Sequence, residues 1–418
     1  MMIRSLFCAC LLLLPISSAR AVDCSIATSA VQIASSIRGL KALHPVPCQI
    51  RNREQVESYL RGTIEKKLAP GRIRHEELAY KLLGLIPQDF PYLDGLIKLY
   101  TSQIGGYYDP EQHYYAMAGW LPSAMQMPIA IHELTHALQD QHYQLAELID
   151  QSRLMTDELM ARMAVAEGDA TAVMLDNARK NSGQRSLARE TSVSGVLMQN
   201  VTSSMLSSAM RDAPPALQSM LVFPYISGLN FVHRLLREDG YRAVDRCFKH
   251  LPSSTAEVLH PERYLKKHAP FSELDDLALP IGAVEVLGEP VLSDRLGEFI
   301  VSTLLGNWLP AAQASQAAAG WVGDRLTLYE DALHPSGVLT WVLRWESEQE
   351  ALEFFSAIEQ AYEKRFSAAA ELESGSSVWN DRTLGRIVLR SSGLETRLTI
   401  GVPQTTLFAS SANNADQI

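Results

Sequence analysis

Apart from its first residues, the chain lacks an apolar run that is long enough to span a bilayer, and it has no basic run. Acidic residues outnumber basic ones among the 418 residues, and the formal net charge is −10. Nucleic acids and anionic membrane surfaces attract basic proteins, so this charge argues against either as the main partner. An apolar fraction of 47% is typical of a globular protein. We therefore expect about two or three globular domains and no integral membrane segment.

The first residues have the features of an export signal. Arg4 supplies a positive charge, residues 6–16 form a short apolar run, and residues 19–21 read Ala-Arg-Ala, which fits the small-x-small cleavage rule. The apolar run is too short for a permanent transmembrane helix. We therefore expect residues 1–21 to be a signal peptide and the mature protein to be periplasmic or secreted.

Cysteine is scarce, with five residues in the chain. Cys8 and Cys10 would be removed with the signal, which leaves Cys24, Cys48 and Cys247. Export to an oxidising compartment favours a disulfide between Cys24 and Cys48, with Cys247 buried and inert. None of the three has the spacing of zinc ligands, so a metal site would have to use histidine and carboxylate side chains.

Residues 132–142 read His-Glu-Leu-Thr-His-Ala-Leu-Gln-Asp-Gln-His and contain the motif H-E-x-x-H. On a helix, His132 and His136 lie on one face and can bind one ion, and Glu133 can reach a metal-bound water without being a ligand. Apolar residues at helical spacing predict a helix from Pro128 towards Asp150. This pattern is typical of a zinc hydrolase, in which the carboxylate acts as the general base.

Two residues are candidates for the third zinc ligand. His142 lies where metzincins have their third histidine, but Gln139 replaces the helix-breaking glycine, so an unbroken helix would point His142 away from His136. Glu167 belongs to the next predicted helix and has small neighbours, which permit two helices to approach closely. We favour Glu167, which completes a set of two histidines and one glutamate.

Further residues are candidates for supporting roles. Asp169 suits a role as acceptor for the free N–H of a ligand histidine, and Asp140 competes for that role. Besides zinc, the oxyanion of the reaction needs a hydrogen-bond donor. The candidate donors are an imidazole held by a following proline and the tyrosines of one short segment, namely His260, Tyr107, Tyr108 and Tyr114.

Residues 105–118 carry two tyrosine-rich runs around an Asp-Pro turn and predict a β-hairpin. Such a hairpin before an H-E-x-x-H helix is common in zincins, whose edge strand holds an extended substrate. The alternative is a covering hairpin whose tyrosines only pack. The remaining helices of this part are predicted at residues 25–43, 53–68, 74–86, 93–102, 157–179, 197–211, 215–238 and 241–250.

From about residue 275 the pattern changes to a mixture of helices and strands. We predict helices at residues 293–308 and 348–366, a turn at 320–324, strands at 326–330 and 338–345, and a hairpin at 386–400. The predicted fold is α+β and mostly α. It has a zincin-like domain at 22–272, a smaller C-terminal α+β module at 273–403 and a flexible tail at 404–418.

The chain resembles gluzincin-type zinc metallopeptidases of the zincin superfamily, and in particular a group of exported bacterial proteins. The resemblance rests on Tyr107-Tyr108-Asp109-Pro110, the motif at 132–142, Ala166-Glu167-Gly168-Asp169-Ala170, Phe223-Pro224-Tyr225, Ser254-Thr255 with His260-Pro261-Glu262, and Gly320-Trp321 with Gly323-Asp324. It covers most of the mature chain. It implies His132, His136 and Glu167 as zinc ligands and Glu133 as base.

We therefore expect an exported zinc metallopeptidase that hydrolyses peptide or protein substrates. Two alternatives stay open at this point. One is a noncatalytic envelope-binding or assembly protein that keeps a structural zinc, and the other is a zinc amidase that acts on cell-wall peptides. Only the first alternative could dispense with Glu133.

Overall fold

The computed structural model describes residues 24–67, 71–193, 195, 208–266, 289–330 and 337–402. Within these ranges the fold is α+β with more helix than strand, as predicted. No helix in these ranges is both long enough and apolar enough to cross a membrane. The expected signal peptide and C-terminal tail lie outside the described residues.

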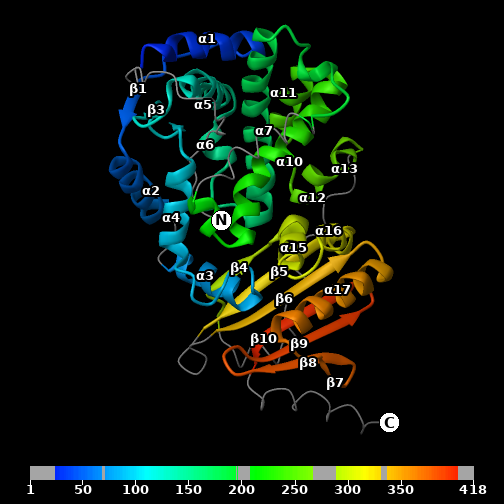
Figure 1. Ribbon diagram of the computed structural model, residues 1–418. Coiled ribbons are helices and arrows are strands. Elements are labelled where there is room, and N and C mark those ends of the chain that lie inside the picture. Colours follow the sequence, from blue (N-terminus) through cyan, green and yellow to red (C-terminus); the bar gives the residue numbers. More distant parts are fainter. Residues whose placement is uncertain are drawn as a thin grey trace. The chain divides into compact units, whose positions relative to one another are not determined.

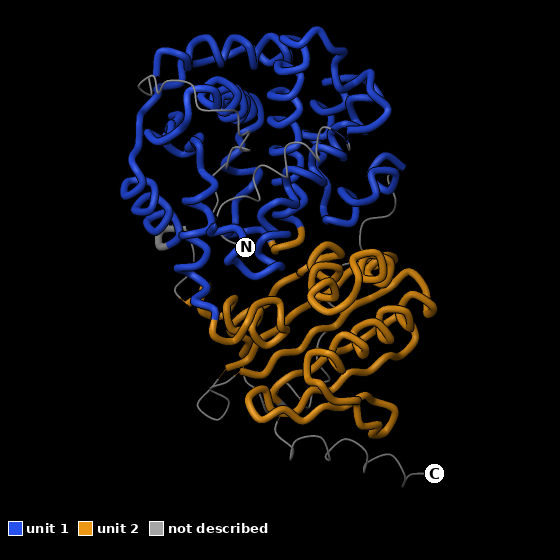
Figure 2. The backbone as a smooth tube through the Cα atoms, in the orientation of Figure 1, with its two compact units in different colours: residues 1–70, 90–154, 158–266 blue, residues 71–89, 155–157, 267–418 orange. Residues whose placement is uncertain are grey.

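The chain divides into two compact units (Figure 2). Unit 1 comprises residues 1–70, 90–154 and 158–266. Its described helices are α1 (Ile26–Arg38), α2 (Arg53–Lys67), α4 (Tyr92–Gln103), α5 (Ser123–Tyr143), α6 (Leu145–Leu148), most of α7 (Thr156–Asn181), α9 (Ser208–Asp212), α10 (Pro215–Asp239), α11 (Tyr241–Lys249), α12 (Thr255–Leu259), α13 (Pro261–Leu265) and the 3-10 helix η1 (Leu187–Arg189) (Figure 1).

A small sheet accompanies these helices. The predicted hairpin is present as the antiparallel strands β2 (Gly106–Asp109) and β3 (Tyr114–Ala118), and all residues of both strands are buried. A third strand, β1 (Cys48–Arg51), pairs in parallel with β3. The order is β1-β3-β2, so β2 is an edge strand of this sheet. The four residues of β1 are too short a pattern for the sequence to predict a strand.

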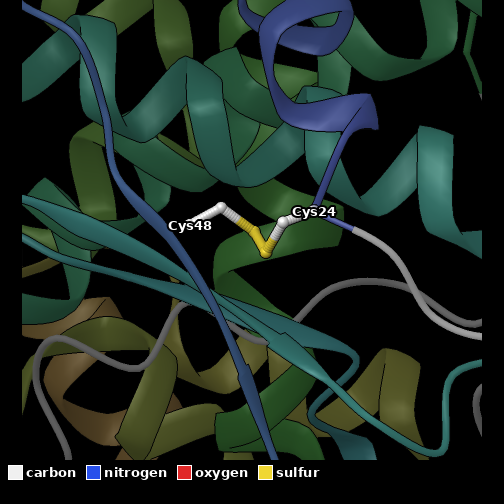
Figure 3. The surroundings of a disulfide bond; sticks show 2 residues. All are labelled: Cys24 and Cys48. Atoms are coloured by element: carbon white, nitrogen blue, oxygen red, sulfur yellow. A yellow bond between two sulfur atoms is a disulfide. The ribbon is translucent and has the colours of Figure 1, made fainter.

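The predicted disulfide between Cys24 and Cys48 is present (Figure 3). It joins the segment just before α1 to the first residue of β1. Cys247 is buried in α11, and burial raises the pKa of its thiol to about 12. It is therefore an inert side chain in the folded protein.

Helix α5 departs from its prediction at both ends. It begins at Ser123, so Pro128 lies inside the helix and not at its start. It ends at Tyr143, because Gln144 adopts the left-handed conformation with φ 56°, and α6 follows as a separate turn. Residues 132–142 nevertheless lie on one unbroken helix, which was the reason for preferring Glu167 to His142 as the third ligand.

Unit 2 comprises residues 71–89, 155–157 and 267–418. Its sheet has the order β4-β5-β6-β10-β9-β8-β7 with antiparallel pairs throughout, and α15 and α17 pack against it (Figure 1). The strands are β4 (Leu292–Asp294), β5 (Trp321–Tyr329), β6 (Val338–Trp345), β7 (Glu371–Glu373), β8 (Ser376–Asp381), β9 (Gly385–Ser392) and β10 (Glu395–Val402). The helices are α3 (Arg72–Leu83), α15 (Gly297–Gly306), α16 (Ala311–Ala318) and α17 (Glu348–Phe366).

The division differs from the predicted domain boundaries, because residues 71–89 and 155–157 cluster with the C-terminal unit. Within that unit, the hydroxyl of Tyr362 donates to the carbonyl of Leu83 at 3.0 Å, and the Asn307 side chain donates to the carbonyl of Gly84 at 2.9 Å. These bonds connect residues more than 200 positions apart, which local sequence patterns do not reveal.

The predicted turn at 320–324 is wrong, because residues 321–324 belong to β5. Asp324 is buried and accepts hydrogen bonds from the backbone N–H groups of Leu296 (3.0 Å) and Gly297 (2.9 Å). It also accepts from the indole N–H groups of Trp321 (3.1 Å) and Trp341 (2.8 Å). The Gly-Trp-x-Gly-Asp sequence thus encodes a structural anchor that connects the start of α15 with β5 and β6.

Candidate metal centre

Two histidines of α5 and one glutamate of α7 meet inside unit 1. His132 Nε2 lies 3.0 Å from Glu167 Oε2 and 3.1 Å from His136 Nε2. His136 Nε2 lies 3.6 Å from Glu167 Oε2. All three side chains are buried, and one potential ligand atom from each lies within 4.8 Å of the others. Among the described residues this group could hold a metal ion, and two imidazoles with one carboxylate are a donor set that zinc accepts.

Hydrogen bonds define which nitrogen of His136 faces the other two ligands. The side-chain N–H₂ group of Gln139 donates to the carbonyl of Ala166 (3.0 Å) and to Asp169 Oδ2 (2.9 Å), both of which can only accept. Gln139 Oε1 therefore faces His136 Nδ1 at 2.8 Å, and this nitrogen must carry the proton. In the neutral imidazole, Nε2 of His136 then presents a lone pair to Glu167. Two acceptors that face each other in this way fit a cation between them.

The pKa shifts of His132 and Glu167 suit a metal ion. Burial lowers the pKa of His132 below its usual value, although Glu167 opposes this shift. Burial alone would raise the pKa of Glu167, but the neighbouring histidines outweigh it and hold the pKa below its usual value. Neutral imidazoles and an ionised carboxylate are the forms that bind metals.

Glu133 lies on the same helix, next to His132, and is completely buried. Its Oε2 accepts a hydrogen bond from the backbone N–H of Tyr108 in the edge strand β2 at 3.0 Å. Its Oε1 has no hydrogen-bond partner among the described residues. Burial raises the pKa of Glu133 well above its usual value, and the neighbouring Glu167 carboxylate adds to the shift. A bound cation would oppose it, because an opposite charge favours the carboxylate.

The predicted role of Asp169 needs a correction. It does not accept directly from a ligand histidine, because Gln139 lies between Asp169 and His136. Asp140 is not that acceptor either, since its Oδ2 lies 2.9 Å from both the Tyr108 hydroxyl and His113 Nδ1. Gln139 was missed in the sequence, although its position three residues after His136 places it on the same helix face.

The predicted tyrosines lie in the hairpin and are buried. The hydroxyls of Tyr107 and Tyr114 are 3.1 Å apart, and the Tyr107 ring stacks on Tyr59 with centroids 4.5 Å apart. The backbone N–H of Tyr108 donates to Glu133, and Tyr108 also lines a pocket of about 350 Å³. This pocket is also lined by His113 and Asp140. The roles of these tyrosines in substrate or oxyanion binding stay predictions.

The two other candidate histidines lie on separate elements. His142 Nε2 lies 2.8 Å from the carbonyl oxygen of Lys41, so its ring is turned to the loop after α1. His260 is half-buried at the junction between α12 and α13. Its predicted catalytic role stays a prediction.

Two glycines bring α7 and α10 into backbone contact. A Cβ atom on Gly168 would lie 2.2 Å from the carbonyl oxygen of Gly228, and one on Gly228 would lie 2.1 Å from that of Ala164. Larger residues at either position would separate the helices. Glu167 precedes one of these glycines, so the third ligand lies beside the crossing.

The same crossing brings Tyr225 to the metal centre. This half-buried side chain precedes Gly228 by less than one turn of α10, and its ring centroid lies 6.1 Å from that of His132. The sequence contained a signal for it, because Pro224 inside a helical pattern marks an unusual position. Tyr225 was noted only as part of a landmark and not as a site residue.

Comparisons with known proteins bear on unit 2 alone. A family model described as a domain of unknown function (DUF8575) matches residues 285–410. This range contains β4 to β10 and none of the candidate metal ligands. No curated protein matches the chain significantly, and no solved structure does. The chemistry of the buried site in unit 1 therefore carries the functional argument.

Proposed function

We propose that the protein is a zinc-dependent peptidase with His132, His136 and Glu167 as metal ligands and Glu133 as general base. The observation that carries this proposal is the carboxylate of Glu133, which is buried beside the three ligands with Oε1 unpartnered among the described residues. Burying such an oxygen without a hydrogen bond costs about 1–3 kcal/mol or more. A function that uses this oxygen accounts for the cost.

Bound zinc would act as a Lewis acid and would lower the pKa of a coordinated water towards neutrality. Glu133 supplies the proton acceptor at Oε1, while the Tyr108 N–H fixes the carboxylate through Oε2. The same oxygen can pass the proton to the leaving nitrogen, which an amide needs in order to depart as an amine. Glu133 thus serves first as base and then as acid.

Tyr225 is the candidate donor to the oxyanion in this proposal. Its ring lies beside His132, and a phenol hydroxyl can donate a hydrogen bond to a developing negative charge. In the hairpin, the hydroxyl of Tyr107 lies 3.1 Å from that of Tyr114, and the hydroxyl of Tyr108 donates to Asp140 at 2.9 Å.

A structural metal site is the second candidate, because His132, Glu133 and His136 are each 0% exposed and Glu167 only 1%. Such burial is typical of structural sites. However, structural zinc sites almost always have four protein ligands. The described part of the chain offers three at this centre. The three-ligand set therefore favours the catalytic proposal.

The test is hydrolysis of denatured casein by the purified chain, before and after removal of metal with a chelator and after return of zinc. We expect activity that the chelator abolishes and zinc restores. Glu133→Gln should abolish most of this activity. The exposed Glu57 on α2 offers the matched control for that substitution, so Glu57→Gln should behave like the wild-type protein. A fully zinc-loaded protein without any hydrolysis would contradict the peptidase proposal and favour the structural site.

A further inference from the structure

Arg38, the last residue of α1, is an arginine that is only 1% exposed. Buried arginines are rare and need charged partners. Its Nε donates to Asp169 Oδ2 at 2.8 Å, and its Nη1 donates to Asp245 Oδ1 at 2.7 Å. The guanidinium also lies 4.9 Å from the ring centroid of Tyr241. Arg38 is thus held firmly, with Asp169 as its completely buried partner.

The hydrogen bond between Arg38 and Asp169 is the first of three consecutive hydrogen bonds that end at the proposed metal ligand His136, and we call these three bonds the series. The oxygen of Asp169 that accepts from Arg38 also accepts from Gln139 Nε2 at 2.9 Å. The other end of this amide, Oε1, accepts from His136 Nδ1 at 2.8 Å. Each group in the series has one possible direction of donation, because the guanidinium only donates and the carboxylate only accepts.

We infer that Arg38 is a positioning residue of the metal centre and acts on His136 through Asp169 and Gln139. Arg38 fixes the Asp169 carboxylate, and the carboxylate fixes the amide of Gln139 with its oxygen towards His136. The amide then keeps the proton on Nδ1, so Nε2 retains the lone pair that a metal needs. Such partners of a ligand typically change metal affinity by about 10- to 100-fold.

The structure shows why a residue of the first helix can have this role. Arg38 and Asp169 are 131 positions apart in the sequence. Helix α1 packs along α5, and the disulfide between Cys24 and Cys48 attaches its N-terminal side to β1. Both ends of α1 are therefore fixed by long-range contacts. The contact at its C-terminal end is the hydrogen bond from Arg38 to Asp169.

The inference rests on the proposed metal site but not on peptidase activity, so its test measures zinc affinity. We would determine the zinc dissociation constant of the full chain by competition with a chromophoric chelator, for Arg38→Gln, Gln139→Leu and the double variant. Each single variant should bind zinc about 10- to 100-fold more weakly. The double variant should bind no more weakly than Gln139→Leu, because Arg38 acts through Gln139.

Asp245→Asn is the matched control, since it removes the other ion pair of Arg38 and leaves the series to His136 intact. It should retain the wild-type zinc affinity. An unchanged zinc affinity in Arg38→Gln would overturn the inference. So would a double variant whose fold-loss of zinc affinity equals the product of the losses in the two single variants. If Arg38→Gln does not fold, Arg38→Lys replaces it in the same double-variant comparison, because lysine keeps the charge but loses the planar fork.

The absorption spectrum of the protein with cobalt in place of zinc gives a second measurement. A general loss of stability would not change the positions of its bands. The absorption bands of bound cobalt report ligand geometry, so Arg38→Gln should shift them and Asp245→Asn should not. Zinc binding without hydrolysis in the wild-type protein would count against the peptidase alone. Hydrolysis with multiplicative effects of the two substitutions would count against the role of Arg38 alone.

Discussion

Glu133 in unit 1 and Asp324 in unit 2 are both completely or almost completely buried carboxylates, but their hydrogen bonds differ. Asp324 accepts from two backbone N–H groups and two indoles. Glu133 accepts from one backbone N–H and has an oxygen without a partner among the described residues. Burial raises the pKa of both groups. A raised pKa therefore does not distinguish these two carboxylates, whereas their hydrogen bonds do.

The largest effect that we predict for the region around Glu133 is the loss of zinc affinity when a ligand is replaced. Glu167→Gln replaces a charged ligand by a neutral amide, so we expect zinc to bind at least about 100-fold more weakly. His142→Gln is the matched control, because His142 contacts Lys41 and not the centre. Competition with a chelator measures both constants. Zinc that is retained by Glu167→Gln and lost by His142→Gln would reverse our choice of ligand.

Asp324→Asn tests the structural side of the comparison. An amide oxygen cannot accept all four bonds that the carboxylate accepts, and its N–H₂ group faces donors. We expect the free energy of unfolding to fall by about 2–4 kcal/mol, with zinc affinity unchanged. Urea denaturation and chelator competition measure the two quantities. Lost zinc affinity in a protein of unchanged stability would contradict the assignment of Asp324 as an anchor.

Tyr225→Phe tests whether the residue beside His132 belongs to the functional region. Loss of one oxyanion donor lowers kcat by about 100-fold, and we expect this fall with unchanged zinc content. Tyr107→Phe is the comparison variant in the hairpin, and it should lower kcat less than Tyr225→Phe does, because the Tyr107 hydroxyl lies 3.1 Å from that of Tyr114. Equal kcat values for wild-type protein and Tyr225→Phe would remove Tyr225 from the mechanism.

The smallest effect is a dependence of stability on pH in the metal-free protein. The pKa of Glu133 is higher in the folded state than its usual value of 4.5, so the folded state holds a proton that the unfolded chain releases. This group therefore lowers stability as the pH rises from 4.5 towards the raised pKa. Glu133→Gln does not titrate, and its stability relative to wild-type should increase over this interval.

Urea denaturation at several pH values measures this difference, and added zinc should reduce it, because the cation favours the charged carboxylate. A stability difference that is independent of pH in the metal-free proteins would show that Glu133 does not carry a raised pKa.

The sequence predicted the parts of the site that depend on local patterns. His132, Glu133 and His136 follow from helical spacing, and Glu167 follows from its small neighbours on the next helix. The grouping of the three ligands is confirmed as geometry, while zinc and its chemistry stay proposals. The β-hairpin and the helix α17 were also predicted, because their patterns are contained in short continuous segments.

The residues that the sequence did not reveal depend on long-range packing. The spacing of Gln139 and His136 places both on one helix face, but the direction of the Gln139 amide depends on Asp169 and Ala166, which belong to another helix. Arg38 of α1 bonds to Asp169, and Tyr225 of α10 lies beside His132. Pro224 marks the position next to Tyr225 as unusual, but no local pattern shows either contact. The region around Asp324 looked like a turn because of its glycines, whereas its hydrogen-bond donors come from other segments.

The central claim is that Glu133 has a catalytic role and that the three neighbouring side chains hold the metal. The most direct test is the kcat of Glu133→Gln at full zinc occupancy, with metal content measured on the same sample. We predict full zinc binding and a kcat that is about 10²- to 10⁴-fold lower than that of the wild-type protein. Wild-type kcat in a zinc-loaded Glu133→Gln protein would contradict the account.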